Sequence, residues 1–184
     1  METKDFPQKF WIYLAAASLI GAGYVDFPLI AYHFEKAFVV SDDWIPVFYA
    51  VATGVDALAA LIFGYLFDRI GFSILIMAAF ISTFFAPLVF LGGFYLSLIG
   101  MILWGVGMGA QESIMRAAIA EMVSANRRAS AYGIFNAGYG LFWFLGSVVM
   151  GILYDLSLPV LITFSVVTQL ASVPIFFLVK KGGK

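Results

Sequence analysis

Long apolar segments alternate along this chain with short polar or glycine-containing breaks. Windows of about twenty apolar residues run near residues 11–33, 45–67, 73–91, 94–115, 129–153 and 159–179. Each window is long enough for a helix to cross the hydrocarbon core of a bilayer, which is about 30 Å thick. A helix satisfies its own backbone hydrogen bonds in lipid, whereas an open sheet does not. The pattern therefore predicts one all-α membrane domain, residues 1–184, with six transmembrane helices.

The composition agrees with a membrane protein and excludes several other classes. Of the 184 residues, 63% are hydrophobic and 11% are charged, and the mean hydropathy is +1.00. A net charge of −1 offers no basic surface to nucleic acid, so we expect no nucleic-acid partner. Because the chain contains no cysteine, disulfides and thiolate metal sites are excluded. The partner that this composition predicts is the lipid bilayer.

The basic residues predict the orientation of the chain. If the amino terminus is cytoplasmic, the inner side holds Lys4, Lys9, Arg69, Arg116, Arg127, Arg128, Lys180, Lys181 and Lys184. Only Lys36 is then left outside. The opposite orientation would break the rule that basic residues collect on the cytoplasmic side. We expect a multi-pass protein of the cell membrane, plasma or inner, with both termini cytoplasmic.

Two sequence echoes indicate an internal repeat. GYLFD at 64–68 recurs as GILYD at 151–155, and APLVFL at 86–91 recurs as VPIFFL at 173–178, both at an offset of 87 residues. Self-similarity at a fixed offset is typical of duplicated structures. A chance echo is the alternative, since glycine and leucine are common in membrane helices.

The repeat predicts a particular topology. Units of about 1–92 and 93–184 would hold three spans each, and an odd number makes the second unit enter the membrane from the other side. Asp68 would then lie at the inner surface and Asp155 at the outer surface. We therefore expect six transmembrane helices arranged as an inverted three-plus-three repeat.

The loop after the second span resembles the signature loop of the major facilitator superfamily. Gly64, Asp68, Arg69 and Gly71 are spaced G-x-x-x-D-R-x-G, although Phe72 and Ser73 replace the usual basic pair. The run from GVGMGAQESIMRAAIAEMV through RRASAYGIFNAGYG is similar to spans ten and eleven of prokaryotic members.

This resemblance implies one six-helix half of a transporter, most like the carboxy-terminal half. It also implies that the first and fourth helices line a central cavity and that the third and sixth face lipid. Transporters of this family combine two such halves. The resemblance therefore implies secondary active transport of a small solute by alternating access, with a second six-helix half supplied by a second copy or a separate chain.

Acidic residues inside the predicted spans are the first candidates for function. An ionisable group within a span costs roughly 2.5–3.5 kcal/mol on insertion scales and needs a reason. Asp56 lies twelve residues before Asp68, about 18 Å along a helix, which places it near mid-membrane. Burial favours the protonated carboxyl, so Asp56 is the candidate for proton coupling. The alternative is a carboxylate bonded to nearby hydroxyls or to a cation on the second half.

Four further residues complete the candidate proton or substrate pathway. Asp26 precedes Phe27 and Pro28, and a proline frees a backbone carbonyl within a helix. Asp26 with Tyr24 would contact a polar or cationic substrate, or the segment is only a structural kink. Gln111 lies in the cytoplasmic half of the fourth span. Asn136, in the glycine-rich fifth span, would reach a substrate or, as we favour, bond to a neighbouring helix.

Charged residues near the inner surface form a candidate gate. Glu112 and Arg116 are four residues apart and share one helix face in the favourable acid-first order. By resemblance, a charged cluster at this surface locks the cytoplasmic side through ion pairs and opens during transport. The members of the predicted gate are Gly64, Asp68, Arg69, Gly71, Glu112, Arg116 and Arg128. The alternative is a solvated inner face that only sets topology.

Three rival interpretations remain. QESIMR at 111–116 superficially resembles a motif of intramembrane CAAX-type proteases, but Gln111 replaces the first glutamate and the chain has one histidine. With no nucleotide or nucleophile motif in the sequence, we expect neither an enzyme nor a bound cofactor or metal. A non-transporting six-helix regulatory or chaperone subunit of a membrane complex would show the same pattern. So would a fragment of a full-length transporter.

Overall fold

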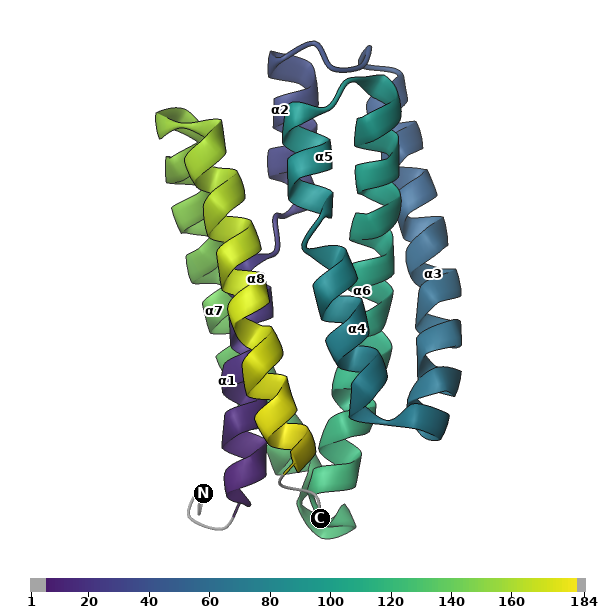
Figure 1. The fold of residues 1–184 in the computed structure, drawn as a ribbon, viewed down its shortest axis with the longest axis vertical. Helices are drawn as coiled ribbons and strands as arrows, with labels where there is room; N and C mark the ends of the chain where they lie inside the picture. Colours follow the sequence, from purple (N-terminus) through teal and green to yellow (C-terminus); the bar gives the residue numbers. More distant parts are fainter. Residues whose placement is uncertain (1–5, 182–184) are drawn as a thin grey trace.

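The computed structural model describes residues 6–181, and within that range the chain is helical with no strand (Figure 1). In order, the elements are α1 (Gln8–Gly23), α2 (Phe27–Lys36), α3 (Trp44–Ile70), α4 (Phe72–Ser82), α5 (Phe85–Leu91), α6 (Phe94–Met122), the 3₁₀ turn η2 (Ala125–Arg127), α7 (Arg128–Leu156) and α8 (Leu158–Lys181). They form six segments long and apolar enough to cross a membrane, because α1 with α2 and α4 with α5 each make one span. The predicted all-α fold with six spans is confirmed.

The spans run up and down through the bundle. In Figure 1, α1 begins and α8 ends at the same end of the molecule, where the α3–α4 and α6–α7 turns also lie. The links from α2 to α3, α5 to α6 and α7 to α8 lie at the opposite end. Two lysines used for the predicted orientation, Lys4 and Lys184, lie outside the described residues.

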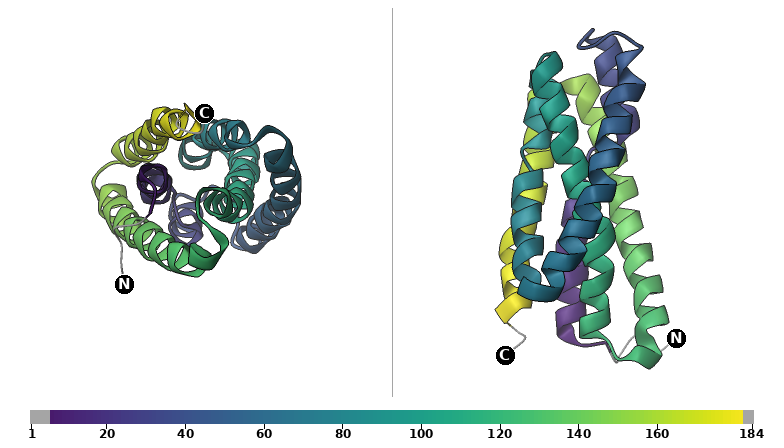
Figure 2. Two further views of the ribbon diagram at one scale, coloured as in Figure 1. Left: turned by 90° about the horizontal axis from the view of Figure 1, so that it is seen from below. Right: turned by 90° about the vertical axis from the view of Figure 1, so that its right-hand side faces the viewer.

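The helix contacts follow a symmetric pattern. α3 packs along α6, and α1 packs along α7; α4 and α5 lie against α6, and α8 lies against α1. If the first three spans are exchanged for the last three, the α3–α6 contact becomes the α7–α1 contact, and the contact of α4 and α5 with α6 becomes that of α8 with α1. The third and sixth spans also touch, through α4 and α8. Figure 2 shows the resulting bundle of helices from below. The expected inverted repeat requires this pairing.

Glycines permit the two equivalent close contacts. A Cβ atom on Gly109 of α6 would lie 2.5 Å from the carbonyl oxygen of Asp56 on α3, and Gly105 faces Ala52 one turn away. A Cβ atom on Gly146 of α7 would collide with the backbone of Ala22 on α1. Small residues let membrane helices approach until their backbones touch. The second span, α3, therefore packs closely on the fourth, α6, and the fifth span, α7, packs closely on the first, α1.

Two spans are interrupted, which differs from the continuous helices expected at 11–33 and 73–91. The first breaks at residues 24–26, and the third breaks at Thr83 and Phe84. Pro28 does not kink a continuous helix; it occupies the first turn of α2, where its missing N–H is tolerated. The break in the first span places three residues of extended or irregular backbone inside the bundle.

Candidate functional site

The break between α1 and α2 is held by side chains from two other spans. The indole Nε1 of Trp104 donates to the Val25 carbonyl at 2.8 Å. The Gly23 carbonyl accepts from Ser165 Oγ at 2.6 Å and from Gln169 Nε2 at 3.1 Å. Unsatisfied backbone groups are costly in lipid, and non-helical backbone persists at membrane depth only where protein supplies partners. Helices α6 and α8 therefore stabilise an unwound segment in the middle of the bundle.

Asp26 is the last residue of this break, and its carboxylate faces α7. One carboxylate oxygen accepts a hydrogen bond from Trp143 Nε1 and the other accepts from Ser147 Oγ. Asp26 precedes the first turn of α2 but makes no side-chain capping bond to it. The side chain is half-buried, so it is neither sealed in the core nor free in solvent. The structure thus places a carboxylate between the first and fifth spans.

A second polar cluster lies between α6 and α7. Gln111 is buried; its Nε2 donates to the Gly107 carbonyl at 3.0 Å, and its Oε1 accepts from the Tyr139 hydroxyl at 2.6 Å. A small pocket of about 100 Å³ opens beside this pair, and its lining residues are Gln111, Glu112, Met115, Arg116, Phe135, Asn136 and Tyr139. Two predicted pathway residues, Gln111 and Asn136, therefore meet two predicted gate residues, Glu112 and Arg116.

Aromatic side chains on α7 join the two clusters. Phe135, Tyr139 and Trp143 follow each other at intervals of four residues, with ring centroids 5.7 Å and 5.5 Å apart. Tyr139 lies within electrostatic reach of both Asp26 and Glu112. Because Trp143 binds Asp26 and Tyr139 binds Gln111, the chain of contacts runs from the helix break to the small pocket. We call this set, Asp26, Trp143, Tyr139 and Gln111, the polar track.

Asp56 lies in the middle of α3, close to α6. It is half-buried, and its Oδ1 atom is buried without a hydrogen-bond partner among the described residues. Glu112 is near enough for the two negative charges to interact. The expected alternative, a carboxylate bonded to neighbouring hydroxyls, is therefore not seen at this oxygen.

Tyr24, the remaining predicted pathway residue, lies inside the helix bundle. Its side chain is 0% exposed, and its hydroxyl donates to the Trp104 carbonyl. Tyr24 also packs against Phe85 with ring centroids 5.0 Å apart. Here Tyr24 supports the helix break, and it also lies within electrostatic reach of Tyr139 in the polar track.

The charged residues of the predicted gate are all exposed, and no ion pair joins them within residues 6–181. The Arg69 guanidinium lies over the Tyr65 ring at 4.3 Å. Arg128 donates to the carbonyls of Ala120 at 2.9 Å and Val123 at 3.4 Å, at the carboxyl end of α6. In this conformation, these two arginines contact an aromatic ring and a helix end.

The two glycines of the gate motif differ in their roles. Gly71 has φ +56° and ψ −142°, a conformation in which a side chain is strained, and its N–H donates to the Phe67 carbonyl at 2.8 Å. Gly64 lies within α3, and a Cβ atom added there would meet no neighbouring atom within 4 Å. Gly71 is therefore required by the turn, whereas nothing around Gly64 requires a glycine.

Among the described residues, one ion pair forms, between Lys36 and Asp155, at the end of the molecule opposite the predicted gate. Lys36 Nζ lies 3.8 Å from Asp155, and it also lies over the rings of Tyr32 at 5.0 Å and Tyr154 at 5.2 Å. Asp155 occupies the position in GILYD that Asp68 occupies in GYLFD. The two related motifs thus differ, because Asp155 makes an ion pair and Asp68 makes none with the residues that the structure describes.

Sequence reasoning missed three residues of the site on α7, namely Tyr139, Trp143 and Ser147. With Asn136 they repeat at intervals of three and four, so they share one face of a helix. The glycines of this span indicated only close helix packing. The periodicity of its polar and indole side chains was a signal that could have found them.

Comparisons with known proteins agree with this architecture. Residues 9–183 match the family described as the Major Facilitator Superfamily. Uncharacterized proteins of Mycobacterium tuberculosis and Mycobacterium bovis are each 33% identical to the chain over 174 residues, which cover 95% of this chain and 42% of the relative. The chain thus spans less than half the length of these relatives.

Proposed function

Because the chain belongs to the Major Facilitator Superfamily, a family of membrane transporters, we propose that it moves a small solute across the membrane by alternating access. The observation that carries the proposal is the Asp26 carboxylate, held at an unwound segment of the first span by Trp143 and Ser147.

Discontinuous membrane helices are common at the substrate sites of secondary transporters. An unwound segment offers backbone groups and a side chain at a depth where a continuous helix offers neither. Asp26 would bind a cationic or hydrogen-bond-donating group of the solute. Gln111 and Asn136, farther along α6 and α7, would contact the solute on its way to the cytoplasmic side.

We propose further that this chain acts as a half-transporter. It spans 42% of the length of its relatives, and transporters of this fold combine two six-helix halves. Helices α3 and α7 are the least buried of the six spans, so they offer the surface for the second half. The chain would correspond to the carboxy-terminal half, and the second half would be another copy or a separate chain.

The orientation and the gate belong to the same proposal. With the α3–α4 turn on the cytoplasmic side, Arg69, Arg128 and Lys180 all lie at that side, as positive charges should. The gate would form its ion pairs only in a conformation closed to the cytoplasm. Asp68 is exposed and makes no ion pair with another described residue, as we expect of a conformation in which this gate is open.

Uptake into proteoliposomes tests the proposal. A screen of small cationic and polar solutes with the purified chain first identifies a transported compound, and the Asp26→Asn variant is then compared with it. We expect uptake to fall about tenfold or more, because a hydrogen bond to a charged group contributes about 1.5–3 kcal/mol.

Glu35→Gln is the matched control, since it removes a carboxylate from an exposed position of the same span. Its uptake should stay near that of the unaltered chain. Full activity of a correctly inserted Asp26→Asn variant would remove Asp26 from the transport site. Absence of flux for every solute, together with stable binding to a full-length carrier, would favour the regulatory-subunit alternative.

A further inference from the structure

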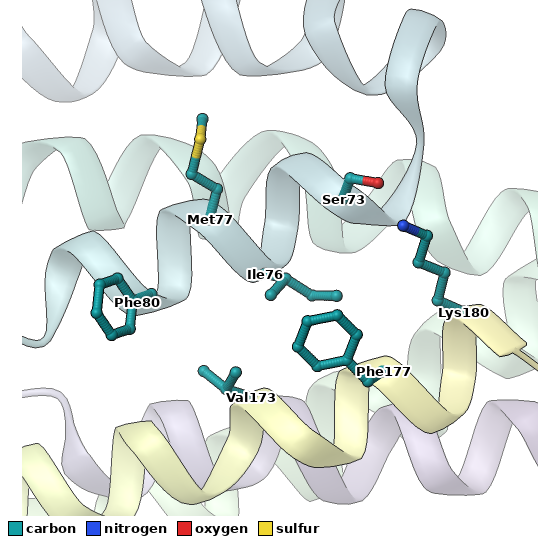
Figure 3. Close-up of a pocket in the computed structure, with 7 residues that line it drawn as sticks. All are labelled: Ser73, Ile76, Met77, Phe80, Val173, Phe177 and Lys180. Carbon is teal, nitrogen blue, oxygen red and sulfur yellow. The ribbon is translucent and has the colours of Figure 1, made fainter.

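An apolar groove lies between the neighbouring helices α4 and α8, and Figure 3 shows the residues that line it. Its volume is about 370 Å³, and its lining residues are Ser73, Ile76, Met77, Phe80, Val173, Phe177 and Lys180. The close-up in Figure 3 shows Ser73 and Lys180 together at one end, with Phe80 toward the other. The groove therefore has a polar, cationic mouth and an apolar body.

The groove is short enough to lie within one leaflet of a bilayer. Ser73 and Phe80 are seven residues apart on α4, and Val173 and Lys180 are seven apart on α8, so each wall extends about 10 Å. One leaflet contributes about 15 Å to a hydrocarbon core of about 30 Å. A partner helix would need a groove through the whole membrane, whereas an acyl chain can lie in a groove that is confined to one leaflet.

A cationic side chain lies at the mouth of the groove. Lys180 is exposed and makes no ion pair with a described residue, and no acidic side chain is among the described residues of the lining. Lys180 lies near the end of α8, at the surface where α4 begins, so its ammonium group is at headgroup level. Ser73 adds a hydroxyl that can donate to a phosphate oxygen.

Another groove of the molecule provides a natural comparison. Between α7 and α8 lies a larger groove of about 540 Å³, lined by apolar side chains and two threonines, with no charged residue among them. It offers space for lipid but no group that distinguishes one headgroup from another. The α4–α8 groove differs because Lys180 places a cation among its lining residues.

We propose that the α4–α8 groove binds one anionic phospholipid of the cytoplasmic leaflet. The phosphate contacts Lys180 and Ser73, and one acyl chain lies along Ile76, Phe177 and Val173 (Figure 3). This site is separate from the polar track and does not depend on which solute is transported. Bound lipid would tie α4 to α8, the third span to the sixth.

Native mass spectrometry of the delipidated protein tests this site. The probes are palmitoyl-oleoyl phosphatidylglycerol and palmitoyl-oleoyl phosphatidylcholine, which carry the same acyl chains. We expect the first phosphatidylglycerol to bind about fivefold more tightly than the first phosphatidylcholine, the effect expected of one lysine beside an anionic lipid. Lys180→Gln should abolish this preference.

Lys9→Gln is the matched charge control, because Lys9 lies at the same membrane surface but over the Phe72 ring at 4.8 Å. It should keep the fivefold preference. Val173→Trp fills the groove and should weaken first-site binding of both lipids, whereas Val167→Trp, in the α7–α8 groove, should leave it unchanged.

Several results would overturn the proposal. Equal affinity for the two lipids, or equal loss of preference in Lys180→Gln and Lys9→Gln, would assign the effect to general surface charge. Equal first-site lipid binding by Val173→Trp and Val167→Trp would show that the acyl chain does not lie in the α4–α8 groove. If Val173→Trp does not fold by circular dichroism, Val173→Phe provides the same test with a smaller side chain.

Discussion

At the scale of single residues, the two acids within the spans lie in different settings. Asp26 accepts hydrogen bonds from Trp143 and Ser147, so its carboxylate has partners in place. Asp56 has a buried oxygen with no partner among the described side chains and has Glu112 nearby. A bonded carboxylate suits the recognition of a solute, whereas a carboxyl without partners suits the uptake and release of a proton.

Asp56→Asn tests the second role. If Asp56 carries the coupled proton, the variant should still equilibrate solute across proteoliposomes but should lose the dependence of uptake on an imposed pH gradient. Uptake measured across a series of gradients gives the comparison, with Glu35→Gln as the control that keeps its pH response. An unchanged pH dependence in Asp56→Asn would remove this residue from the coupling mechanism.

At the scale of elements, the α3–α4 turn separates a structural role from a functional one within a single motif. Gly71 adopts a backbone conformation that other residues rarely tolerate, and its N–H closes the end of α3 on Phe67. Asp68 is exposed and makes no ion pair within the described part of the chain. The glycine therefore shapes the turn, and the acid is free to act in the proposed gate.

Substitutions in and near this turn should separate stability from transport. Gly71→Ala should lower the free energy of unfolding by about 1–3 kcal/mol because it forces a strained backbone conformation. Gly64→Ala, with open space around it, should not. Asp68→Asn should keep the stability and membrane insertion of the unaltered chain but lower transport. Thermal unfolding in detergent and uptake measure these effects, and normal transport by Asp68→Asn would refute the gate.

At the scale of the whole molecule, the bundle leaves one pair of spans poorly covered. Leu58 on α3 is 62% exposed and Phe144 on α7 is 65% exposed, and both helices are less buried than the other spans. Under the proposed inverted repeat, with units of about 1–92 and 93–184, these are equivalent helices. A second half would cover both of them at once and enclose the face that they flank.

Disulfide cross-linking tests whether the second half is another copy. The chain has no cysteine, so the Leu58→Cys, Phe144→Cys double variant carries only the engineered pair. Both positions lie a similar distance from the outer ends of their helices, so two parallel copies related by a two-fold axis would bring them together. We expect a covalent dimer on oxidation of native membranes.

Leu178→Cys, exposed on α8, is the control that should remain monomeric. A cross-linked product of a different mass would indicate a separate chain as the second half. A protein that stays monomeric in mild detergent and still transports in liposomes would contradict the requirement for a second half.

Much of the architecture could be predicted because membrane crossing depends on segment length and composition. Six windows near 11–33 to 159–179 became six spans, with ends that differ by a few residues except α6, which continues to Met122. These properties are local: twenty apolar residues cross a bilayer whichever helix they contact. Gly71 was likewise recognisable, because a turn between two helices often requires a glycine.

The site depended on contacts that local sequence does not encode. Asp26 meets Trp143 and Ser147 across more than 115 residues of chain. Tyr24 is buried, and its hydroxyl donates a hydrogen bond to the backbone carbonyl of Trp104. Which face of α7 meets the first span is decided by the close approach of Gly146 to Ala22. The sequence by itself determined a six-span membrane protein and its candidate acids. Only the tertiary structure decided which acid has partners, because helix packing selects the neighbours of each side chain.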